Sequence, residues 1–266
     1  MDFGLQGRTA VITGGSMGIG KAVATSLAAE GANLVLIARG EEDLQAASAE
    51  LGQSGAEVLP LVADLTDPES VDAAAEQAAE RFGTINILVN NAGHRMRSMD
   101  RQIYWKDEEW LGDVDIKTFG MLRAVRAFHP HLATDGSGRI VNVSGVAGEM
   151  IFHTALTHGL NNAAVIQATK YLAADLAPDK ITVNTVSPGL VATEWRHGWA
   201  EMMAGNQDKS KEEFLADYCR AMGVLNGRWG DPAEVADVVT FLASDRGGYI
   251  NAAVIEVDGG LTANSR

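Results

Sequence analysis

The stretch TGGSMGIG, from Thr13 to Gly20, decides the fold. It follows the apolar run TAVITG at 9–14 and opens a segment rich in Ala and Leu, so it marks a turn from a strand into a helix. Glycines at such a turn let the backbone bend tightly and approach a diphosphate, which binds the free N–H groups at the positive end of the helix. Glycine-rich turns also occur without ligands, but this position in the chain favours a nucleotide site.

Six more short apolar runs follow this turn, and longer segments of helical period separate them. The runs are ANLVLIA at 32–38, AEVLPLVA at 56–63, INILVNNAG at 85–93, GRIVNVSG at 138–145, KITVNTVSPG at 180–189 and AAVIEVDGG at 252–260. Nearly continuous apolar strands are typical of a parallel sheet covered on both faces. The pattern therefore predicts an α/β protein with a Rossmann-type doubly wound parallel sheet of about seven strands in three layers, α/β/α.

Length and composition fit one domain over residues 1–266, since 46% of the residues are hydrophobic and 21% are charged. The net charge of -14 has the wrong sign for attraction to nucleic acid or to anionic lipid. No apolar run approaches the roughly 20 residues that a membrane span needs, and the single cysteine, Cys219, cannot form an internal disulfide. We therefore expect a cytoplasmic protein with a small-molecule substrate, no nucleic-acid or membrane partner and no metal site.

The motifs, taken in order, resemble the short-chain dehydrogenase/reductase family from about residue 5 to residue 262. After the glycine turn come Asp64-Leu65, Asn90-Asn91-Ala92-Gly93, Pro188-Gly189 with Thr193, Arg228-Trp229-Gly230-Asp231-Pro232 and Val257-Asp258-Gly259-Gly260. Each motif is modest alone, but their shared order and spacing are specific. The resemblance implies the expected fold, and a dimer or tetramer built on the long helices that follow the fourth and fifth strands.

The resemblance also implies where a dinucleotide binds. It places Asp64 and Leu65 at the adenine, Asn91 to Gly93 at the ribose, and Val191 and Thr193 at the nicotinamide carboxamide. The full expected set is Gly14, Ser16, Met17, Gly18, Ile19, Gly20, Arg39, Asp64, Leu65, Asn91, Ala92, Gly93, Asn162, Pro188, Gly189, Val191 and Thr193.

The end of the second strand favours NADP(H) over NAD(H). An acidic residue at the Ala38 position would hold the ribose hydroxyls of NAD and repel an extra phosphate. Ala38 carries no charge, and Arg39 follows it. Arginine suits a phosphate, so we expect NADP(H), with NAD(H) as the alternative; Arg39 as a plain surface cation is the competing interpretation.

The catalytic positions depart from the family pattern. The resemblance implies an Asn, a Ser, a Tyr and a Lys that relay a proton to a substrate carbonyl. Here the aligned positions hold Lys117, Gly145, His158 and Asn162. Ser144 lies one residue before Gly145, so along a strand its side chain should face the opposite side.

Three interpretations of these substitutions remain open. In the first, the protein is an atypical oxidoreductase acting on an alcohol, a ketone or an activated double bond. Its catalytic residues are then His158 as acid/base, Lys117 as a nearby cation and Asn162, which can still bond to a ribose hydroxyl. Histidine suits this role because its reference pKa of about 6.5 lies near neutrality. In the second, the chain is a lyase or isomerase that uses Lys117 and His158. In the third, it binds the nucleotide without catalysis.

Residues 194–230 form the irregular part of the chain and, by the resemblance, a substrate lid. We expect Trp195, Trp199, Met202, Met203 and Met222 either to cover an apolar substrate or to pack the lid onto the sheet. Arg95, Arg97 and Arg101 follow the NNAG motif and either hold an acidic group or lie in solvent.

Overall fold

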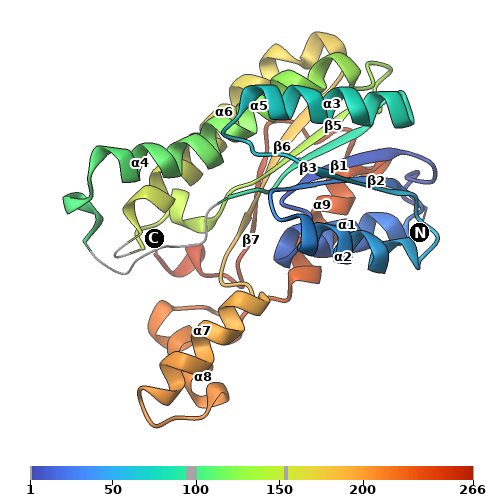
Figure 1. Ribbon diagram of the computed structural model, residues 1–266. Coiled ribbons are helices and arrows are strands. Elements are labelled where there is room, and N and C mark those ends of the chain that lie inside the picture. Colours follow the sequence, from blue (N-terminus) through green and yellow to red (C-terminus); the bar gives the residue numbers. More distant parts are fainter. Residues whose placement is uncertain (1, 94–100, 153–154, 266) are drawn as a thin grey trace.

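The computed structural model describes residues 2–93, 101–152 and 155–265 (Figure 1). Seven parallel strands form one sheet in the order β3-β2-β1-β4-β5-β6-β7. They are β1 (Thr9–Thr13), β2 (Asn33–Ala38), β3 (Val58–Val62), β4 (Ile87–Asn90), β5 (Arg139–Val143), β6 (Thr182–Pro188) and β7 (Val254–Val257). The seven strands expected from the sequence and the doubly wound fold are confirmed.

Helices cover both faces of the sheet. They are α1 (Gly18–Ala29), α2 (Glu41–Gly52), α3 (Pro68–Phe82), α4 (Asp107–Val114), α5 (Gly120–Phe128), α6 (Leu156–Asp175), α7 (Glu194–Gly205), α8 (Lys211–Met222) and α9 (Pro232–Ala243). Figure 1 shows α1, α2 and α9 on one face and α3, α5 and α6 on the other. A π-helical turn, η2 (Asp115–Phe119), joins α4 to α5, and a short 3-10 turn, η4 (Val146–Gly148), follows β5.

The alternation of side chains along each strand builds two separate cores. In β1, Ala10 and Ile12 are fully buried against α1 and α9, whereas Val11 is fully buried on the opposite face. Successive side chains of a strand point to opposite faces, so a strand covered on both sides needs apolar residues throughout. This explains why the strands read as continuous apolar runs.

The strand order reverses beside β1, because β2 pairs with one edge of β1 and β4 with the other. The chain leaves β2 toward α2 on one face of the sheet and leaves β4 toward α5 on the other face (Figure 1). The connections at the carboxyl ends of the strands therefore separate beside β1. Such a switch point opens a crevice where ligands of doubly wound proteins bind.

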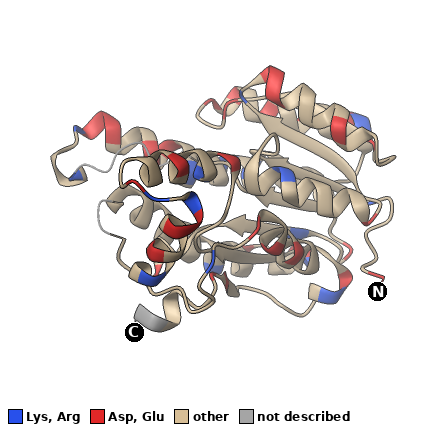
Figure 2. Ribbon diagram, turned by 90° about the horizontal axis from the view of Figure 1, so that it is seen from below, with Lys and Arg blue, Asp and Glu red and all other residues tan. Residues whose placement is uncertain are grey.

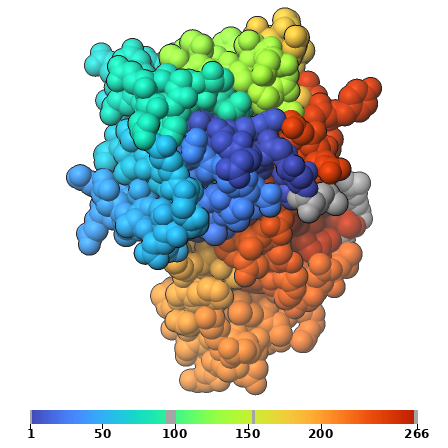
Figure 3. Space-filling model, turned by 90° about the vertical axis from the view of Figure 1, so that its right-hand side faces the viewer, coloured from blue at the N-terminus to red at the C-terminus, as the bar shows by residue number. Residues whose placement is uncertain are grey.

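Helices α7 and α8 form a lobe that projects away from the sheet, at the bottom of the molecule in Figures 1 and 3. An aromatic cluster holds the lobe together. The Trp199 ring stacks on the Trp229 ring, with their centroids 6.2 Å apart, and Phe214 and Tyr218 meet Trp199 edge-on at centroid distances of 5.6 and 5.4 Å. The lobe is therefore a small hydrophobic unit with its own core.

Charged positions are spread over the molecule, and acidic residues occur on many of the helices (Figure 2). Over the three described stretches of the chain, no helix is both long enough and apolar enough to cross a bilayer. Cys219 is a buried free thiol on α8.

Candidate active site and nucleotide cleft

A cleft of about 840 Å³ runs along the carboxyl ends of the strands. Arg39 and Asp64 line it where β2 and β3 end, and His158, Trp195 and Arg196 also line it. Of the residues that the sequence assigns to the nucleotide, all but Gly20 and Asn162 line this cleft. The fold therefore brings together side chains and backbone from six separate strand ends.

The glycine turn is held against β4 by Asn91. The Asn91 side-chain amide donates to the carbonyl oxygens of Thr13 and Gly14, both at 3.1 Å, and the Thr13 hydroxyl accepts from the Asn91 N–H at 3.0 Å. Gly20 packs beneath the same turn, since a Cβ there would lie 2.1 Å from the Gly14 carbonyl oxygen. Gly20 thus shapes the turn from below, and the Asn91 amide braces it.

The start of α1 suits an anionic group. Gly14 and Gly18 have φ of 67° and 54°, a region that favours glycine. The first turn of α1 contains no acidic residue, and no side chain caps it. The N–H groups of a helix start carry partial positive charge, so these residues fit a diphosphate.

The far end of the cleft carries Arg39 and two carboxylates. Burial raises the pKa of Asp64, but hydrogen bonds from Thr66 and the charge of Arg39 outweigh it and hold that pKa below its ordinary value. The Arg39 guanidinium lies 4.0 Å from the Asp64 carboxylate and is largely exposed. Asp43, which the sequence analysis did not single out, lines the same end.

Thr193 lies against the glycine turn: its methyl group would be 3.4 Å from a Cβ at Gly18. Thr193 therefore lies in the cleft beside the start of α1, and its contact with the nicotinamide carboxamide stays a prediction. Val191 pairs with Gly230 in an isolated bridge and is buried, so the start of the lobe is fixed to the sheet at this point.

Lys117 projects from the π-helical turn η2 into the middle of the cleft. Its ammonium group donates to the Ser144 carbonyl oxygen at 3.1 Å and lies about 4.0 Å from where a Cβ of Gly93 would be. Burial lowers the pKa of Lys117 to about 8. The cation therefore connects the NNAG loop with the end of β5.

His158 lines the cleft from the first turns of α6. Burial, and then the charges of Lys117 and Arg196, lower the pKa of His158 to about 3, so the imidazole is neutral at physiological pH. A hydrogen bond from the Thr118 hydroxyl to the Asn161 side-chain oxygen, at 2.7 Å, ties η2 to α6. This bond, which the sequence gave no signal for, fixes Lys117 and His158 relative to one another.

Asn162 does not reach the cleft. It is fully buried, and within the described part of the chain neither atom of its amide has a hydrogen-bond partner. A Cβ at Gly145 would lie 3.0 Å from the Asn162 amide nitrogen, so the asparagine packs behind this glycine. The Ser144 hydroxyl points back to the Val186 carbonyl oxygen at 3.4 Å, as expected for the residue next to Gly145.

The side chains that the sequence assigns to residues 194–230 divide between the cleft and the core of the lobe. Trp195 lines the cleft, whereas Trp199, Met203 and Met222 pack in the core of the lobe. Met202 is 57% exposed and does neither. Glu194 and Arg196, which the sequence analysis missed, also line the cleft, and their position just after Thr193 was the available signal.

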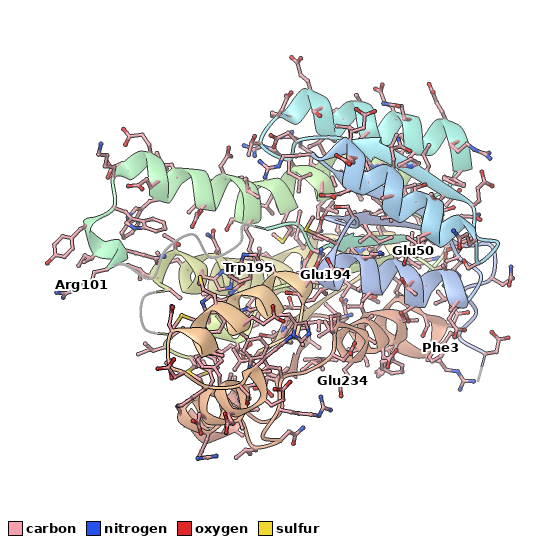
Figure 4. The ribbon with its side chains drawn as sticks, turned by 60° about the horizontal axis from the view of Figure 1, so that its bottom comes forward. Phe3, Glu50, Arg101, Glu194, Trp195 and Glu234 are labelled. Carbon is pink, nitrogen blue, oxygen red and sulfur yellow. The ribbon has the colours of Figure 1, made fainter. Side chains whose placement is uncertain are left out.

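Of the three arginines that follow the NNAG motif, the structure describes Arg101. Arg95 and Arg97 lie outside the described residues. Arg101 is exposed, with its guanidinium 5.6 Å from the Tyr104 ring centroid. Figure 4 places Arg101 beyond the outer end of α4, well away from Glu194 and Trp195.

The sheet order, the glycine turn at the switch point and the cleft together define a dinucleotide-binding α/β protein. A family described as enoyl-(acyl carrier protein) reductase matches residues 14–262. The 3-oxoacyl-(acyl-carrier-protein) reductase FabG of Vibrio cholerae is 35% identical over 257 residues, 97% of this chain and 98% of that protein. The chain belongs to the short-chain dehydrogenase/reductase family.

Two solved structures are similar over nearly the whole chain. L-sorbose reductase from Gluconobacter frateurii, in complex with NADPH and L-sorbose, has a TM-score of 0.92 at 32% identity and covers 98% of this chain and 99% of its own. An NADPH-bound short-chain oxidoreductase from Pseudomonas aeruginosa PAO1, described as containing an atypical catalytic center, has a TM-score of 0.86 at 32% identity and covers 96% of both chains.

Proposed function

We propose that this protein is an NADP(H)-dependent oxidoreductase that interconverts a carbonyl compound and an alcohol, with His158 at the position of the family's usual tyrosine. The observation that carries the proposal is the convergence of His158 and Lys117 in the same cleft as the glycine turn. A nucleotide held by that turn and a substrate beside His158 would then share one space.

The nucleotide supplies or accepts a hydride when it is bound. In this chain the start of α1 receives the diphosphate, and Arg39 receives the additional phosphate of NADP(H), because Ala38 offers no carboxylate to repel it. The NADPH complexes of both similar structures support this choice of cofactor.

His158 and Lys117 divide the proton and charge chemistry. In alcohol oxidation, neutral His158 accepts the hydroxyl proton, and in carbonyl reduction the proton returns to the oxygen. Lys117, with a pKa of about 8, keeps most of its charge at pH 7 and stabilises the negative charge that develops on that oxygen. Its ammonium thereby compensates for the hydroxyl that a serine at Gly145 would supply.

The test is NADPH oxidation and NADP⁺ reduction with a panel of ketones, aldehydes and alcohols, using the wild type, His158→Ala and Lys117→Met. General acid–base catalysis contributes about 100-fold to 10,000-fold, so kcat of His158→Ala should fall by that range while NADPH binding persists. His131→Ala serves as the matched histidine control.

Three results would contradict the proposal. Turnover that is insensitive to His158 removes its assigned role. Tight NADPH binding without turnover of any panel member favours a non-catalytic nucleotide-binding protein. Product formation without change in the nucleotide favours a lyase or isomerase that uses His158 and Lys117.

A further inference from the structure

Arg196 lines the cleft, and no carboxylate of the described residues lies within ion-pair distance of its guanidinium. Its guanidinium lies 5.6 Å from the Trp195 ring centroid and 5.9 Å from that of Trp229. Among the residues that the structure describes, none donates to it, accepts from it or pairs with it as a carboxylate within 4.0 Å. The two indole rings attract the guanidinium, but within the described residues its N–H groups have no carboxylate acceptor.

The carboxylates that line the cleft do not fill this role. Asp43 and Asp64 lie at the opposite end, where Arg39 and Thr66 engage Asp64. Glu194 lines the cleft two residues before Arg196 but is exposed, and residues two apart on a helix do not face each other.

Lys117 is a second cation that acts on His158 together with Arg196. Lys117 and Arg196 both lower the pKa of His158, so both charges lie within electrostatic range of one imidazole. Burial also lowers the pKa of Arg196 itself. The chain as a whole has a net charge of -14, whereas Lys117 and Arg196 place two cations in the same cleft near His158. Burying cations without a counter-charge is costly, and a bound anion removes that cost.

We infer that Arg196 binds an acidic group of the substrate, so that the substrate is an anionic carbonyl or hydroxy compound, an oxo acid or a hydroxy acid, whose reacting carbon lies at His158. This inference rests on the proposed function for the reaction, but the anion site itself does not. Arginine presents parallel N–H donors that match a carboxylate, whereas an ammonium acts as a point charge.

The anion has a consequence for the proposed reaction. A negative group beside Arg196 offsets the positive charges that hold His158 neutral, and an adjacent negative charge favours the protonated imidazole. Binding of the acidic substrate would then raise the proton affinity of His158 when the proton is needed. A neutral substrate of the same shape would lack this effect.

Binding is tested first with benzoate and benzamide, which differ in charge but little in shape, on the NADP⁺-saturated protein. The readouts are Trp fluorescence and the NMR titration of the His158 ring. We expect benzoate to bind at least about 10-fold more tightly than benzamide, and to raise the pKa of His158. Arg196→Met and Arg196→Gln should lower the affinity for benzoate about 10-fold or more and leave the affinity for benzamide unchanged. Arg196→Lys should lower the benzoate affinity less. Arg220→Met, at an exposed position on α8, is the control and should leave the benzoate affinity unchanged.

Each other result has a definite meaning. Equal binding of benzoate and benzamide by the wild type overturns the inference even if the variants fail to fold. The same holds if Arg196→Gln weakens NADPH binding but not benzoate binding, because the guanidinium then holds the nucleotide diphosphate. Selective benzoate binding without reduction of a panel of oxo acids would keep the anion site and contradict the proposed function alone.

Discussion

The buried amide of Asn162 occupies the space beside Gly145, with its nitrogen 3.0 Å from where a Cβ would be. Gly145 and Asn162, which the sequence motifs align with the family's serine and lysine positions, are thus neighbours in the structure. Asn162 therefore leaves little room for a side chain at position 145.

Gly145→Ser should destabilise the protein, because its Cβ and hydroxyl would push against Asn162. Overpacking of this kind typically costs about 1–3 kcal/mol. Asn162→Ala removes the amide that the new side chain would meet. The loss in free energy of unfolding of the double variant should therefore be smaller than the sum of the two single losses, by about 0.5 kcal/mol or more. Urea unfolding of the four proteins measures this coupling. Gly52→Ser, with nothing within 4 Å of its Cβ, is the control; strictly additive effects would show that the contact carries no energy.

Arg39→Ala should change nucleotide preference. Hydrogen bonds to charged groups contribute about 1.5–3 kcal/mol, so the Kd for NADPH should rise about 10-fold to 100-fold while that for NADH stays the same. Fluorescence titration with both nucleotides measures this, with Arg220→Ala as the control arginine. An equal loss of affinity for NADPH and NADH would mean that Arg39 does not bind the additional phosphate.

Acid should destabilise the protein partly through His158. Its pKa is about 3 in the folded protein and 6.5 in the unfolded chain, so between these values the unfolded chain binds more protons. Stability from this group is complete above about pH 6.5 and is lost as the pH falls toward 3, at up to about 1.4 kcal/mol per pH unit. Urea unfolding from pH 7 to pH 4 should show a shallower loss for His158→Asn than for His131→Asn. Identical slopes for the two variants would contradict the shift.

Lys117 should act in the alkaline range. Its pKa is about 8 when folded and 10.5 when unfolded, so the unfolded chain holds the extra proton between these values. This group therefore adds stability as the pH rises from about 8 to 10.5, again at up to about 1.4 kcal/mol per pH unit. Unfolding of Lys117→Met should lack that increase, whereas unfolding of Lys170→Met, on the exposed face of α6, should retain it. In the proposed reaction, kcat should also decline above about pH 8 as the ammonium loses its proton.

The sequence predicted those features that depend on the types of neighbouring residues. Apolar runs of strand length, separated by helical segments, predict a sheet covered on both faces, and all seven strands lie where the runs do. The glycine turn was equally readable, because positive φ at Gly14 and Gly18 and the close packing of Gly20 all require glycine. Motif order located most of the cleft lining for the same reason: in a doubly wound fold, residues at strand ends meet at one edge.

The directions of side chains were harder to predict from the sequence. His158 and Asn162 stand four residues apart on α6, and helical spacing places them on one face, yet only His158 lines the cleft. How far each side chain reaches depends on how α6 packs against the turn after β5. There a Cβ at Gly148 would lie 2.7 Å from the Ala163 nitrogen. That packing joins residues distant in sequence, and no local pattern encodes it.

By itself, the sequence determined the doubly wound sheet and the glycine turn, and it predicted the replacement of the usual catalytic residues, because periodicity, glycine conformation and motif spacing are properties of neighbouring residues. Only the tertiary structure decided that Arg196 and Lys117 lie around one neutral imidazole and that Asn162 lies behind Gly145. Electrostatic and packing relationships of this kind depend on distances between elements that are far apart in the chain, and those distances exist only once the lobe and the helices have packed onto the sheet.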